Sequence, residues 1–100
     1  MSPQEKTPKD LLKEVYLGRK AKNRYYSLRA YARDLKVSQT LISLILSGKR
    51  TLTLKTAKRM SSLLMLSKEE EGELLDLTLE TKRKLREERR KERAQRALSH

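Results

Sequence analysis

Residues 28–50 read LRAYARDLKVSQTLISLILSGKR, and this stretch decides the fold of the chain. Small and apolar side chains recur in it at the spacing expected of two short helices that cross around a tight turn. They are Ala32 and Leu35 in the first helix, Val37 in the turn, and Ile42 and Ile45 in the second helix. The pattern therefore predicts a helix-turn-helix unit.

The second helix of this unit keeps a short polar face on its outer side. Amide and hydroxyl side chains can satisfy the donors and acceptors that base edges present in a major groove, and an apolar side chain can touch a thymine methyl group. The glutamine is expected to make the most specific contact, as a bidentate partner of adenine. The predicted base-reading residues are Gln39, Thr40, Ser43 and Leu44.

Basic residues flank that polar face on both sides. A basic pair follows the second helix of the helix-turn-helix unit directly, and two arginines lie on the first helix of that unit. Side chains of this kind position a protein on a nucleic-acid backbone without reading its sequence. The predicted phosphate contacts are Arg29, Arg33, Ser38, Lys49, Arg50 and Lys55.

The run SQTLIS followed by LSGKR resembles the second half of the helix-turn-helix in the phage-repressor and Cro class, the lambda-repressor-like proteins. A run of the form S-Q-x-x-I/V-S-x-I/L-x-S-G-K-R is frequent in that class, and the resemblance covers Tyr25 to about Leu66. It implies an all-α, five-helix, lambda-repressor-like domain that reads double-stranded DNA with its third helix, as bacterial and phage transcriptional regulators do. Two positions depart from the class: Lys36 stands where glycine is common, and Leu44 where a polar or basic reader is frequent.

Helix start and stop signals organise the rest of the chain. Thr7-Pro8-Lys9-Asp10 predicts a helix from Pro8 to about Lys22, and Ser27 predicts a second over residues 28–35. Ser38 caps a third helix that ends before Gly48, Thr53 caps a fourth, and Ser67 with Glu70 begins a fifth. We expect a DNA-binding domain over residues 1–79 and a charged basic helical tail over residues 80–100.

Several apolar and aromatic residues have expected structural roles. Tyr31 lies beside Ala32 in the second helix and is expected in the core, and Met60 and Met65 are expected to fill it. Tyr25 and Tyr26 precede Ser27, where either one can pack against the helix entry or contact phosphate. The sequence leaves these two roles open.

The tail after Glu80 reads TKRKLREERRKERAQRALSH and is charged on nearly every face. Glu80 with Lys84, Glu87 with Lys91 and Glu92 with Arg96 are spaced for helical pairs worth only about 0.2–0.5 kcal/mol each. Three interpretations stay open: a solvated helix that frays, a basic arm along a neighbouring phosphate backbone, or the start of a longer protein. A homodimer, if one forms, is expected to use the leucines just before the tail, Leu74, Leu75, Leu77 and Leu79.

Composition narrows the class of protein. The 100 residues carry a net charge of +12, which favours polyanions or anionic membranes as partners, and they contain no cysteine. The single histidine, His100, stands alone at the end, so we expect no catalytic residues, metal site, cofactor or small-molecule substrate, and no enzyme. No apolar run has the length of a membrane span or a signal peptide, so a cytoplasmic, nucleoid-associated protein is expected.

Two other functions compete with DNA reading. In the first, Leu44 and Leu46 on the third helix dock a protein partner, as in an antitoxin or adaptor. In the second, the arginine-rich tail binds RNA, since such segments can fold on RNA.

Overall fold

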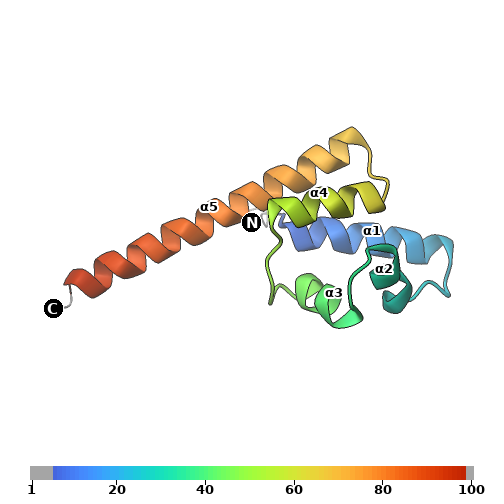
Figure 1. Ribbon diagram of the computed structural model, residues 1–100, viewed down its shortest axis with the longest axis horizontal. Helices are drawn as coiled ribbons and strands as arrows, with labels where there is room; N and C mark the ends of the chain where they lie inside the picture. Colours follow the sequence, from blue (N-terminus) through green and yellow to red (C-terminus); the bar gives the residue numbers. More distant parts are fainter. Residues whose placement is uncertain (1–5, 99–100) are drawn as a thin grey trace, which may run out of the picture.

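The computed structural model describes residues 6–98, and within that range the chain is entirely helical apart from turns and connections. The elements are α1 (Pro8–Lys22), α2 (Leu28–Asp34), α3 (Gln39–Leu46), α4 (Leu54–Leu63) and α5 (Lys68–Leu98) (Figure 1). The predicted all-α class and the five helices are confirmed. His100 lies outside the described residues.

Side-chain caps begin the helices where the sequence predicts them. The hydroxyls of Ser27, Ser38 and Thr53 accept the backbone N–H three residues later, at 3.1, 3.0 and 3.2 Å respectively. Such a bond satisfies one of the N–H groups that a helix start leaves without a partner. In α1 the Asp10 carboxylate accepts from the backbone N–H of Thr7 at 2.9 Å and from its hydroxyl at 2.8 Å. These two donors hold the pKa of Asp10 below its ordinary value.

Three helices end in the same way, with one residue in the left-handed conformation. Lys36 (φ 55°), Gly48 (φ 81°) and Met65 (φ 55°) follow the C-caps of α2, α3 and α4. The next residue after each one donates its N–H back across the turn, from Val37 to Ala32 at 3.0 Å in the first case. This is the Schellman arrangement, in which glycine is usual because a side chain is strained there.

The position of Met65 differs from the core role predicted from the sequence. Its left-handed backbone turns the side chain out of the domain, and 87% of the residue is exposed. Leu64 and Leu66 on either side of it are buried and half-buried against the core. The expected core role of Met65 is therefore wrong, whereas Met60 is buried as predicted.

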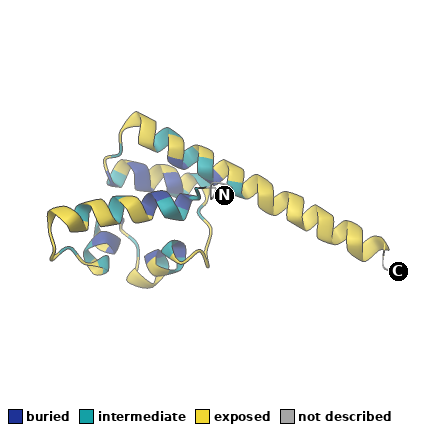
Figure 2. Cartoon of the chain, turned by 180° about the vertical axis from the view of Figure 1, so that it is seen from behind, coloured by how far each residue is buried: buried dark blue, intermediate teal, exposed yellow. Residues whose placement is uncertain are grey.

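All five helices contribute to the core: α1, α4 and the first part of α5 lie together on one side of it, and α2 and α3 close it from below (Figures 1 and 2). Tyr31 is fully buried and its hydroxyl donates to the carbonyl oxygen of Leu12 at 2.8 Å, which joins α2 to α1. Its expected core role is confirmed. The side chains buried with it are Leu11, Leu12, Ala32, Leu35, Ile42, Ile45, Ala57, Met60, Leu64 and Leu74.

The second half of α5 leaves the domain. Leu74 and Thr78 are buried, but every described residue from Lys82 to Leu98 is exposed (Figure 2). The helix continues without a break across the predicted boundary between residues 79 and 80. None of the helices in the described range combines the length and the apolar character needed to cross a membrane.

Candidate functional site

Helix α3 presents a polar outer face over a buried apolar one. Ile42 and Ile45 are buried, whereas Gln39, Thr40 and Ser43 are exposed. Leu44, the fourth predicted base-reading residue, is half-buried. The helix is therefore held by its isoleucines, and its short polar side chains are left accessible on the surface.

The protein-docking alternative requires an exposed Leu46, and the structure does not place it so. Its side chain is half-buried and packs against the core cluster. That alternative counted on an exposed apolar pair, and packing removes one of the two members. Leu44 remains as a partly exposed leucine within a polar face.

The turn after α3 holds the basic pair close to the end of the helix. The carbonyl oxygen of Leu44 accepts from the backbone N–H groups of Lys49 at 3.0 Å and Arg50 at 3.2 Å. The hydroxyl of Ser47 donates to the same oxygen at 3.1 Å. Both basic residues are exposed. Gly48 permits this reversal because a left-handed backbone carries no penalty without a β-carbon.

The other predicted phosphate contacts lie on the neighbouring elements. Arg29 and Arg33 are exposed on α2, and Lys55 is exposed in the first turn of α4. Ser38 is exposed at the start of α3, where its oxygen accepts the cap bond from Leu41. A serine hydroxyl also carries one donor, which the cap bond does not use.

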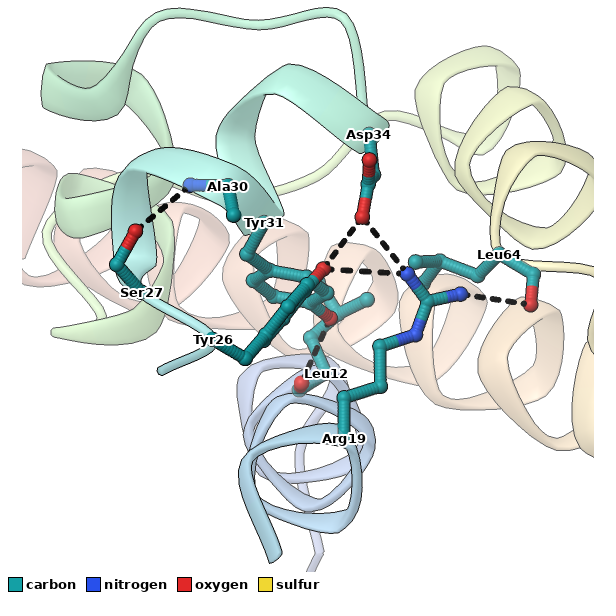
Figure 3. A network of polar contacts seen from close by, with 8 residues as sticks. All are labelled: Leu12, Arg19, Tyr26, Ser27, Ala30, Tyr31, Asp34 and Leu64. Carbon is teal, nitrogen blue, oxygen red and sulfur yellow. Dashed lines mark hydrogen bonds and ion pairs between the residues drawn. The ribbon is translucent and has the colours of Figure 1, made fainter. Parts of the chain in front are cut away.

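A polar network sets the position of α2, and with it the two exposed arginines (Figure 3). The Arg19 guanidinium on α1 donates to the Asp34 carboxylate at 3.1 Å and to the Leu64 carbonyl oxygen at 3.3 Å. The Tyr26 hydroxyl donates to Asp34 at 2.6 Å and accepts from Arg19 at 3.2 Å. These bonds join α1 to the end of α2 and to the end of α4.

The network also separates the roles of the two adjacent tyrosines. Tyr26 packs against Tyr16 and Tyr31, with ring centroids 6.1 and 6.3 Å away. Burial, together with the hydrogen bond to Asp34, raises the pKa of Tyr26. Tyr25 is 78% exposed and lies under the guanidinium of Arg24, 4.9 Å from its ring centroid. The hydroxyl of Tyr25 accepts from the Arg24 guanidinium at 2.8 Å at the surface, whereas the hydroxyl of Tyr26 is engaged within the network.

The charge of this region is almost entirely positive. Residues 23–66 contain nine lysines and arginines and a single acid, Asp34. The carboxylate of Asp34 is half-buried and is bonded to Arg19 and Tyr26, so its charge is compensated by α1. The stretch that contains α3 therefore carries exposed cations and no unpaired carboxylate.

The sequence pattern missed the residues that position this surface. Arg19 and Asp34 belong to different helices and are 15 residues apart, so no local periodicity relates them. Within residues 6–98, no three carboxylate or histidine side chains come together in a group that fits a metal ion.

No family model matches this chain, and neither the curated proteins nor the solved structures contain a protein that matches it. The functional argument therefore rests on the surface around α3 and on its charge.

Proposed function

We propose that this protein binds double-stranded DNA in a sequence-specific manner and acts as a transcriptional regulator of the lambda-repressor-like type from a bacterium or phage. One observation carries the proposal: neutral hydrogen-bonding side chains are exposed on α3, and exposed cations are carried by the helix before it and by the turn after it. Neutral donors and acceptors read base edges, and the surrounding cations contact phosphate. A surface that only needs to be solvated requires no such arrangement.

Helix α3 enters the major groove with its amino-terminal end leading. Gln39, in the first turn, places its amide against a base edge, where the donor and the acceptor together match adenine. Thr40 and Ser43 bond to neighbouring edges or phosphates, and the half-buried Leu44 contacts a thymine methyl group.

The basic residues fix the domain on the backbone at either side of that groove. Arg29 and Arg33 contact phosphates from α2, while Lys49 and Arg50 contact them from the turn after α3. These contacts hold α3 in register and supply the salt-dependent part of the affinity. Ser38 and Lys55 add contacts at the starts of α3 and α4.

The test is selection of bound fragments from a random duplex pool, followed by two substitutions. Gln39→Ala is expected to cost roughly 1–3 kcal/mol on the selected site and to relax preference at one base pair. Arg50→Ala is expected to weaken selected and random duplexes about equally and to reduce the log–log salt slope by about one. Both side chains are exposed, so the thermal midpoint should stay unchanged in either variant.

Two results would overturn the proposal. If no duplex is enriched, or if neither substitution affects binding, then α3 does not face DNA. If instead Gln39→Ala lowers affinity uniformly and Arg50→Ala changes base preference, the roles of reader and positioner are reversed.

The same selection tests the symmetry of the complex. A homodimer predicts a near-palindrome with half-site centres about 34 Å apart, one turn of the duplex. Of the four leucines predicted to form the dimer contact, Leu74 is buried, and Leu75 and Leu77 pack against the core of their own chain. Only Leu79, which is 49% exposed, is left to contact a second copy. An asymmetric site bound by a monomer in sedimentation would exclude a dimer.

A further inference from the structure

The exposed half of α5 separates its charges onto two faces. With 3.6 residues per turn, Lys82, Arg86, Arg89, Arg93 and Arg96 follow one line along the helix, and Arg83 and Arg90 lie beside that line. We call these seven residues the cationic face. The four acids of the segment lie on the other half of the helix together with two lysines, as Glu80, Lys84, Glu87, Glu88, Lys91 and Glu92.

Side-chain positions agree with this projection. Arg86, Arg89, Arg90 and Arg93 line one surface hollow, and no other residue contributes to it. Within residues 6–98 no ion pair forms at these four arginines, whereas Arg83 at the edge of the face lies 3.7 Å from Glu80. Four adjacent guanidinium groups without a carboxylate repel one another, and an anionic partner removes that repulsion.

From this arrangement we propose that the cationic face binds the phosphate backbone of the same DNA duplex that α3 reads. The inference rests on the proposed function and adds a second contact surface to it. Arginine suits this role because its planar fork of donors matches phosphate oxygens.

The chemistry of the face disfavours other partners. Two copies of this helix that met through their cationic faces would bring like charges together along the whole line of contact. A membrane surface requires an apolar face beside the basic one, yet the two leucines of this segment, Leu85 and Leu98, project about 140° from one another, so they form no apolar face. Phosphate groups in a regular array are the remaining match.

The course of α5 brings its exposed half to the level of α3. The helix begins beside the end of α4, on the side of the molecule away from α3, and its carboxyl end comes down to the level of α3 in both views (Figures 1 and 2). From Lys82 to Arg96 the face spans about 21 Å at a rise of ~1.5 Å per residue. That length corresponds to about six base pairs at ~3.4 Å each, so the contact would extend the footprint to one side of the α3 site.

A pair of matched double substitutions in the full chain tests the proposal. Arg86→Gln with Arg93→Gln removes two charges from the cationic face, and Lys84→Gln with Lys91→Gln removes two from the opposite half. Both pairs are seven residues apart, and glutamine is a good helix former, so circular dichroism and the thermal midpoint should match those of the unmodified protein.

The readout is duplex affinity against potassium chloride concentration, measured by fluorescence anisotropy on a duplex from the selection. The cationic-face variant should lose about 1.8 in log–log slope, since each lost phosphate contact removes about 0.9. The variant with Lys84→Gln and Lys91→Gln should keep the log–log salt slope of the unmodified protein. Base preference should stay the same in both, because these contacts carry no sequence information.

Each other outcome has a definite meaning. Equal losses in the two variants, or no loss in either, would overturn the cationic-face contact while leaving duplex binding by α3 intact. Loss of binding to a structured RNA hairpin, with an unchanged duplex slope, would assign the face to RNA instead. If the unmodified chain binds no duplex at all, the proposed function itself fails and this contact fails with it.

Discussion

Met65→Gly should stabilise this protein, although it removes a large apolar side chain. Met65 follows the C-cap of α4 in a left-handed conformation, φ 55°, and 87% of the residue is exposed. A side chain in that conformation costs about 1–2 kcal/mol because its β-carbon crowds the following carbonyl oxygen. Glycine avoids this cost, and almost no packing is lost with the exposed side chain.

The gain is reduced by an effect in the unfolded chain. Glycine increases the freedom that folding must remove, which costs about 0.4–1 kcal/mol. With the midpoints of the two ranges, about 1.5 and about 0.7 kcal/mol, the net stabilisation should be about 0.8 kcal/mol. For a domain of this size, each ~1 kcal/mol moves the thermal midpoint by about 4–8 °C, so the expected rise is about 3–6 °C.

Thermal unfolding followed by circular dichroism measures the change, and Lys58→Gly is the control. Lys58 is exposed, as Met65 is, but it stands in the middle of α4, where the backbone is right-handed. Glycine there should lower the free energy of unfolding by about 0.5–1 kcal/mol. If Met65→Gly lowers the midpoint as Lys58→Gly does, then residue 65 is not left-handed and its side chain packs in the domain.

Three further predictions concern the domain. Tyr31→Phe should lower the free energy of unfolding in urea by about 0.5–1.5 kcal/mol, because the buried bond to the Leu12 carbonyl oxygen is lost, whereas Tyr25→Phe should change it little. Burial raises the pKa of Tyr31 and of Tyr26, so the folded chain keeps two phenolic protons that the unfolded chain releases above about pH 10. Stability should therefore fall as pH rises beyond 10, and a chain with phenylalanine at both positions should show a shallower decline in the same urea titration. Deleting residues 82–100 should leave cooperative unfolding and the thermal midpoint nearly unchanged, because the described residues from Lys82 onward are all exposed; a broad transition would show that this part of α5 packs on the domain.

The sequence alone predicts the start of each helix, because the signals are local. A hydroxyl at Ser27, Ser38 or Thr53 bonds an N–H three residues later, so both partners lie within one turn. The buried sides of α3 and α4 follow from helical periodicity for the same reason. The exposure of Gln39, Thr40 and Ser43 could be predicted in this way, since Ile42 and Ile45 determine which side of α3 faces inward.

Only the tertiary structure decides which side chains meet across helices. Tyr26 and Tyr25 are neighbours of one chemical type, yet Asp34 and Arg19 bond one of them and leave the other at the surface. The protein-docking alternative needs Leu46 at the surface, yet it packs inward, and the apolar Met65 is turned outward by its backbone conformation. These outcomes depend on distances between helices and on one φ angle, and a linear pattern of residue types contains neither.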